Sequence, residues 1–325
     1  GVWYMKNKKF LTIIAAVVLS GMLLAAGALA ANPAGSAYEQ FKQLLNGDQV
    51  RIDNASVDVS MSVTDNRQLV LALYGNMKRD SVSDRMSGTF NITGKEKTES
   101  LEVYCNSEEV LFRLAGSDNW YRTTHGNGWR EEERVRRYGR DAEGWDGKDK
   151  QLRDVLFDTV MGDYRDQFSV TESNGFRTFT LSFDEGNMPI LLQAFFQLSD
   201  SGINYEIRDE YDENDNLDDF PQELRDALSR LKEQDHDIEL VEKKLKSLEM
   251  TFTVDQQDRF TGIGIATVCT GKDAEGTVHE LEIDLSVSLT DIGTTVADEA
   301  NPDPASVTVI ENDIFMNAGR RAERG

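Results

Sequence analysis

One acidic stretch of the sequence has the spacing of a calcium-binding loop. Oxygen-bearing side chains stand at the first, third, fifth and twelfth positions of such a loop: Asp212, Asn214, Asn216 and Glu223. A hard cation prefers ligands of this kind, so calcium is the one cofactor that the sequence suggests. Two residues oppose a calcium site, because Leu217 replaces the glycine of the sharp turn and Pro221 interrupts the loop. The simpler interpretation is a solvated acidic linker before a helix, and this interpretation predicts no cofactor.

No residue pattern in the sequence identifies an enzyme. The histidines His125, His236 and His279 are scattered, and none is paired at a spacing that suits a metal. The sequence contains no Gly-x-Ser-x-Gly elbow, no phosphate-binding loop and no dinucleotide fingerprint. Carboxylates are so numerous that an acid–base pair cannot be picked out. We therefore predict a non-enzymatic protein.

A second group of residues is suited to holding an apolar ligand. Large apolar side chains crowd a short predicted helix in "NMPILLQAFFQL" and one side of a predicted hairpin before it. They are Leu191, Leu192, Phe195 and Phe196 in the helix, and Phe179, Leu181 and Phe183 in the hairpin. A helix this apolar is either buried in a core or lines an apolar cavity. A core is the commoner case, and both interpretations stay open here.

Alternation of apolar and polar residues predicts strands along most of the chain. Val57, Val59, Met61 and Val63 interleave with polar residues, and the same period returns in three long segments after residue 247. Short polar turns between the runs favour an antiparallel meander. Helical spacing of apolar residues occurs at 38–45, 152–161, 187–198 and 221–234. We therefore predict an α+β fold, in which a few helices pack on one face of a large curved antiparallel sheet.

The start of the chain predicts export. Three lysines precede an uncharged run at 10–31, and Ala28-Leu29-Ala30 suits cleavage after Ala30 in a bacterial signal peptide. The same run is long enough to cross a bilayer of ~30 Å, so an uncleaved membrane anchor is the alternative. Positive-inside bias places the following residues outside the cytoplasm in both cases.

Three segments follow from this division. Residues 1–31 are the signal peptide or N-terminal membrane anchor, 32–298 form the extracytoplasmic domain, and 299–325 form a C-terminal tail that we expect to be mobile. The location is therefore secreted, or tethered to the outer face of the cytoplasmic membrane. Contact with a membrane is expected only through the N-terminal segment, if it stays uncleaved.

The charge of the chain excludes some partners. The formal net charge is -23, and residues 1–31 hold three lysines and no acid, so the remainder is more acidic still. Such a surface repels phosphate backbones and anionic lipid, which argues against nucleic acid as a partner. No feature indicates a particular protein partner.

The two cysteines each have two interpretations. Cys105 and Cys269 share strand parity with apolar neighbours, so both side chains are predicted to point inward. A disulfide is permitted outside the cytoplasm, and two buried thiols are equally compatible with the pattern.

The order of elements resembles a known family. A leader, a short helix, a long meander broken by helices and a final three-strand return are similar to the half-barrels of the LolA/LppX-like group, the bacterial lipoprotein carriers and related envelope lipoproteins. The stretch "EEVLFRLAGSDNWYRTT" is similar to their strand, polar turn and aromatic-led strand. The resemblance implies a hydrophobic ligand held between sheet and helices. This chain departs from the lipoprotein members because no cysteine for lipid attachment stands near the end of the leader.

These observations predict a non-enzymatic envelope protein that binds a lipid or another hydrophobic molecule between sheet and helices. The alternative is a surface interaction or sensory ectodomain with a solid core and no ligand, stabilised by calcium if the acidic loop binds it.

Overall fold

The computed structural model describes 36–46, 52, 54–95, 97–124, 158, 161–190, 192–193, 196, 221–223, 225–227 and 240–310. The predicted leader and residues 311–325 lie outside this part of the chain.

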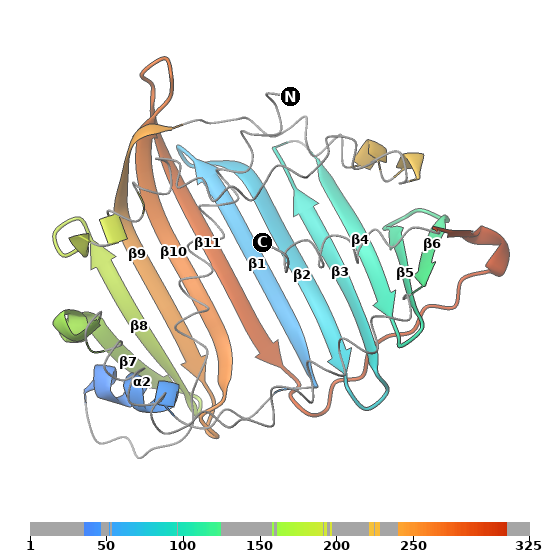
Figure 1. Ribbon diagram of the computed structural model, residues 1–325, viewed down its shortest axis with the longest axis horizontal. Coiled ribbons are helices and arrows are strands. Elements are labelled where there is room, and N and C mark those ends of the chain that lie inside the picture. The colour runs from blue at the N-terminus through green and yellow to red at the C-terminus, as the bar shows by residue number, and fades with distance from the viewer. Residues whose placement is uncertain are drawn as a thin grey trace, which may run out of the picture.

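Twelve strands form one continuous sheet in the described residues (Figure 1). In chain order they are β1 (Ala55–Asp65), β2 (Gln68–Asp80), β3 (Arg85–Thr93), β4 (Thr98–Cys105), β5 (Glu109–Leu114), β6 (Trp120–Thr124), β7 (Phe168–Ser173), β8 (Phe176–Asp184), β9 (Val241–Val254), β10 (Phe260–Lys272), β11 (Val278–Thr290) and β12 (Val307–Val309). Across the sheet the order is β12-β6-β5-β4-β3-β2-β1-β11-β10-β9-β8-β7. Two meanders therefore meet at the centre, where β1 pairs with β11.

The register of these strands separates the sheet into an apolar and a polar face. Residues that lie opposite one another on neighbouring strands form a row across the sheet, which we call a rung. One apolar rung crosses seven strands: Leu181, Met250, Ile265, Leu285, Met61, Leu73 and Ile92. The rungs beside it are formed mostly by serine, threonine and other polar residues. Because successive side chains of a strand point to opposite sides, the alternation in the sequence becomes two continuous faces.

The predicted α+β class is wrong, and the protein is nearly all-β. The expected antiparallel meander is present, but β12 pairs parallel with β6, so the sheet is mixed. The described helices are α2 (Ala37–Asn46), the 3-10 turns η1 (Gly162–Gln167) and η3 (Pro304–Ser306), and short helical pieces within 158–161, 190–196 and 222–227. They do not form a second layer, because α2 and η1 pack at the β7–β8 end and leave the central strands without a described helix.

The larger of the two main hydrophobic clusters lies at the β7–β10 end, and we call it the aromatic core. Phe41 of α2 is its centre, with ring centroids 4.8 Å from Phe252, 5.5 Å from Phe179 and 5.6 Å from Phe168. Tyr38 anchors the same helix through its hydroxyl, which donates to Asp158 at 2.6 Å. The apolar stripe of α2 therefore covers one end of the sheet.

The second main cluster lies at the other end, and we call it the β6 core. Phe112 of β5 and Tyr121 of β6 pack with ring centroids 5.6 Å apart, and Ile310 joins them. The chain reaches Ile310 along the segment after β11, which passes the ends of the central strands before β12 (Figure 1). Lys78 binds Asp298 at 3.0 Å, and Arg85 pairs with Glu299 on the way. Part of the predicted tail, up to residue 310, is thus held on the sheet, and mobility of 311–325 stays a prediction.

The two cysteines are free thiols on distant strands. β4, which carries Cys105, and β10, which carries Cys269, are separated by four strands. At about 4.8 Å between neighbouring strands, the backbones stand roughly 24 Å apart. A disulfide needs Cα atoms within about 7 Å, so this fold excludes a bridge between them. Burial raises the pKa of each thiol to about 11.

Candidate functional site

The predicted ligand-binding residues that the structure describes belong to the aromatic core. Phe179 has no exposed surface, and Leu181 and Phe183 are almost as deeply buried. Phe196 joins the same cluster and Leu192 packs against it, so the structure brings these five residues together. Leu191 and Phe195 lie outside the described residues. Around Phe179 the space is occupied by Phe41 and Phe252, which is the packing of a solid core.

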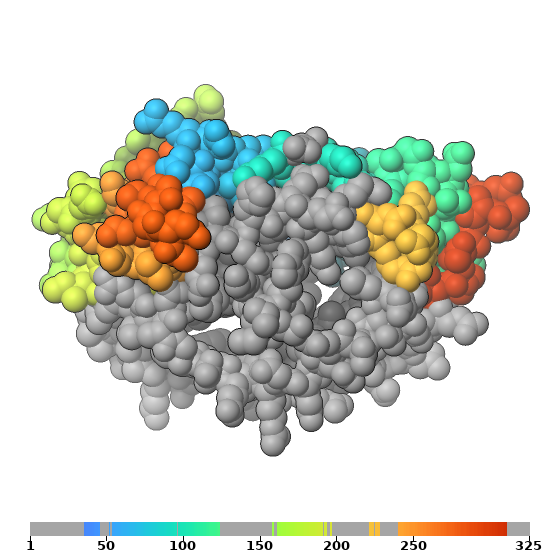
Figure 2. Space-filling model, turned by 90° about the horizontal axis from the view of Figure 1, so that it is seen from above, coloured from blue at the N-terminus to red at the C-terminus, as the bar shows by residue number. Residues whose placement is uncertain are grey.

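Only one residue of the predicted calcium loop is described. Glu223 accepts hydrogen bonds from the hydroxyl of Tyr121 at 2.8 Å and from Asn119 Nδ2 at 3.0 Å. Burial and this bond to Glu223 raise the pKa of Tyr121 to about 12. The contacts fasten the helical piece within 222–227 to β6, and Figure 2 shows this yellow segment beside the green strands. Asp212, Asn214 and Asn216 lie outside the described part, within which no three His, Cys, Asp or Glu residues are arranged to hold a metal.

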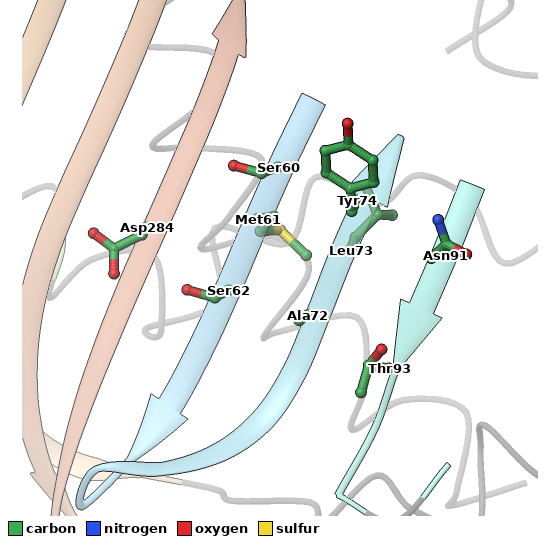
Figure 3. A pocket seen from close by; sticks show the side chains of 9 residues that line it. All are labelled: Ser60, Met61, Ser62, Ala72, Leu73, Tyr74, Asn91, Thr93 and Asp284. Carbon is green, nitrogen blue, oxygen red and sulfur yellow. The ribbon is translucent and has the colours of Figure 1, made fainter. Parts of the chain in front are cut away.

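A depression of about 250 Å³ opens on the polar face, where β11, β1, β2 and β3 lie side by side (Figure 3). Two rungs of the sheet build it. The first contains Ser60, Tyr74 and Asn91, and the second contains Asp284, Ser62, Ala72 and Thr93. The depression exists because the side chains of Ala72 and Ser62 are short, and the larger Tyr74 side chain lies beside it. Met61 and Leu73 also line it, although alternation directs their side chains to the apolar face.

The polar groups around the depression are partly engaged with each other. Ser60 and Ser286 share a hydrogen bond of 2.8 Å, and Ser100 donates to Asn91 Oδ1 at 2.5 Å. The Asn91 bond uses the carbonyl oxygen and orients the carboxamide, whose nitrogen lies on the Tyr74 side in Figure 3. Tyr74 is 51% exposed. The exposed Asp284 carboxylate lies across the depression on β11. An aromatic ring, a carboxamide, a carboxylate and hydroxyls thus surround one small hollow.

The polar face continues into an aromatic and charged patch on β4, β5 and β6. Tyr104 and Trp120 have ring centroids 5.8 Å apart, and the Arg113 guanidinium lies 4.6 Å from the Trp120 ring centroid. Arg113 also binds Glu102 at 2.9 Å. Burial, followed by the charge of Glu102, raises the pKa of Tyr104. These contacts order the patch, because its groups bind one another.

A histidine lies between two carboxylates where the β1–β2 and β10–β11 turns meet. His279 Nδ1 is 2.8 Å from Asp65 Oδ2, and its Nε2 is 3.3 Å from Asp273 Oδ2. Burial lowers the pKa of His279, but the hydrogen bonds to the two carboxylates outweigh burial, and the net effect raises it. These contacts join the two turns through one side chain.

The sequence does not predict the depression, because alternation marks polar residues such as Ser60 and Ser62 only as one side of an ordinary strand. Alternation does identify Ser60, Ser62 and Tyr74 as one face. Nothing in the local pattern places Asp284 beside Ser62, because that pairing depends on the register of β1 with β11.

Comparison with known proteins adds no family. No family model matches the chain, and no curated protein matches it. Among solved structures, one described as "Crystal structure of fusion DH domain" is 12% identical over 75% of this chain and 72% of that chain, with a TM-score of 0.12. A similarity this low does not indicate a shared fold. Within the described ranges, no helix is long and apolar enough to cross a membrane.

Proposed function

We propose that this protein is a non-catalytic, extracytoplasmic binding protein that contacts an envelope partner through the depression on the polar face of its sheet. One observation carries the proposal: the described side chains around Phe179 pack together as a core, whereas an open hollow lies on the polar face. The lysine-flanked run at 10–31 supports the location. In this function the aromatic core is a scaffold that keeps the strands in register.

A pair of arginine variants tests the proposal. Ala72→Arg fills the depression, and Thr180→Arg adds the same side chain to the polar side of β8, away from it. Purified wild type should co-sediment with isolated envelope fractions of the source organism, Ala72→Arg should lose most of that binding, and Thr180→Arg should keep it. Circular dichroism checks that both variants fold. Equal binding by all three proteins, or none by wild type, would falsify the proposal.

A second function, binding of a hydrophobic molecule as in the LolA/LppX-like carriers, is favoured by the middle of the apolar face. Met61, Leu73 and Phe90 are only half-buried there and belong to neither main cluster. Phe90 lies over Gly75, where a Cβ atom would stand 2.9 Å from its ring, so the glycine lets the ring lie close to the sheet. This strip, rather than Phe179 and its neighbours, is where an acyl chain would bind.

Organic extraction of the purified protein followed by mass spectrometry tests the second function. Wild type should carry a lipid, or displace a fluorescent fatty acid from solution, and Leu73→Glu should do neither, because a carboxylate on this face repels an apolar chain. Ser62→Glu adds the same charge to the opposite face and is the control. An extract without lipid, together with no uptake of the fatty acid, would exclude the second function.

A further inference from the structure

The lining of the polar-face depression restricts the chemistry of what it binds. The described lining residues include no lysine, arginine or histidine, and they do include the Asp284 carboxylate. A phosphate or another anion would therefore meet like charge without a cationic partner. A wholly apolar ligand would leave Asn91 and Asp284 without hydrogen bonds to it. A neutral ligand with many hydroxyl groups and at least one apolar surface matches the hydroxyls, the carboxamide, the single carboxylate and the aromatic ring of this lining.

A sugar ring has those two properties. Its hydroxyls donate hydrogen bonds to a carboxylate, and such charge-assisted bonds are stronger than neutral ones. Asn91 supplies both a donor and an acceptor, and its Oδ1 is already used by Ser100, so the Nδ2 group remains to donate to a sugar oxygen. The C–H face of a sugar packs on an aromatic ring, and the half-exposed Tyr74 provides one. Tyrosine is effective in this role because it orders few torsions on binding.

The size of the depression indicates how much of the ligand it holds. About 250 Å³ is slightly below the range of roughly 300–1,000 Å³ that is usual for small-molecule pockets. Ser60, Tyr74 and Asp284 are all exposed, so the hollow is open on the solvent side. A shallow open site of this size suits one unit of a longer chain whose other units lie over the serine- and threonine-rich strands nearby.

We propose that this depression binds one sugar unit of a neutral glycan, with the Tyr74 ring as its apolar platform and Asp284 and Asn91 as its hydroxyl-binding groups (Figure 3). The inference rests on the proposed function, since it names the chemistry of the partner at the same site. It requires no metal and no covalent step.

Affinity electrophoresis with neutral glycans tests the inference. The full chain is run in native gels that contain soluble xylan, glucomannan, laminarin or amylopectin, and titrated with cellohexaose and chitohexaose. At least one probe should retard wild type. Tyr74→Ala and Asp284→Ala should each weaken binding about tenfold or more, the change expected for losing one good contact. Tyr74→Phe keeps the ring, so its affinity should lie within a few-fold of wild type. Thr180→Arg should have the affinity of wild type.

Two results overturn the glycan assignment. In the first, no polysaccharide retards wild type in the gel and no oligosaccharide gives heat when titrated into it. In the second, a probe retards wild type, and the Tyr74→Ala and Ala72→Arg variants are retarded equally. The envelope experiment separates this failure from failure of the proposed function. If Ala72→Arg loses envelope binding while no glycan binds wild type, the site contacts another kind of partner and only the glycan inference fails. If wild type binds neither envelopes nor glycans, both proposals fail.

Discussion

At the scale of single residues, most charged groups with shifted pKa values in the described chain are used to hold elements together. The Asp158 carboxylate accepts from Lys42 at 2.6 Å and from Tyr38, and these bonds lower its pKa. The Glu223 carboxylate also joins two elements, because it accepts a hydrogen bond from Tyr121 of β6. Groups committed to such contacts are poorly placed to exchange protons with a substrate.

His279 makes the stability of the protein depend on pH. When protonated, it donates to both Asp65 and Asp273, whereas the neutral ring donates from one nitrogen only. Because its pKa is raised in the folded protein, its contribution is complete below the unfolded value of about 6.5. That contribution is lost as the pH rises through the folded pKa.

Urea unfolding of wild type and His279→Gln between pH 5 and pH 9 measures this effect. The variant should be less stable at pH 5 by about 1.5–3 kcal/mol, the usual value of a hydrogen bond to a charged group. The difference should shrink towards pH 9. A constant difference across the range would show that the charge of His279 has no part in joining the two turns.

At the scale of elements, the strands could be predicted from the sequence, but their partners could be predicted only in part. Period two identifies β1, β9, β10 and β11, and short turns connect the successive pairs. The pairing of β1 with β11 and of β12 with β6 joins segments far apart in the chain, which local patterns do not specify. The prediction of a helical layer is wrong for the same reason. The helical spacing near Tyr38 does correspond to a helix, but such spacing does not specify how much of a sheet the helix covers.

β12 is predicted to protect an edge of the sheet. It is three residues long, yet it pairs with β6 and brings Ile310 into the β6 core. Deletion of residues 307–325 should expose the unpaired backbone groups of β6, and exposed edges pair with other chains. Sedimentation velocity should show concentration-dependent association of this truncation. A protein that lacks only residues 311–325 retains β12, and its sedimentation should match that of wild type. If the two truncations behave alike, β12 does not protect this edge.

At the scale of the whole molecule, the two main hydrophobic clusters lie at opposite ends of one sheet. The aromatic core covers β7–β10, and the β6 core covers β4–β6. Between them the described residues provide a smaller cluster around Val63 and Ile283. An arrangement of this kind allows each end to open locally with its own free energy.

The two thiols report on the two ends separately. Cys269 lies in the aromatic core, and Cys105 lies on β4 beside the β6 core. Phe41→Leu should therefore accelerate labelling of Cys269 in the native protein more than that of Cys105, and Phe112→Leu should do the reverse. Each substitution should cost about 1–2 kcal/mol, because it removes part of a buried ring. Mass spectrometry of the labelled peptides measures both rates, and parallel acceleration of both thiols would indicate a single cooperative unit.

The central pairing of β1 with β11 also affects how the chain folds. Ser60 and Ser286, which share a hydrogen bond across this pair, are 226 residues apart in the sequence. A loop of that length must close before the two meanders share a sheet, and contacts of such high sequence separation slow folding. Until then β1 presents an unpaired edge that can associate with other chains. The last stage of folding is therefore expected to be the slow joining of two preformed halves, and it is the stage most exposed to aggregation.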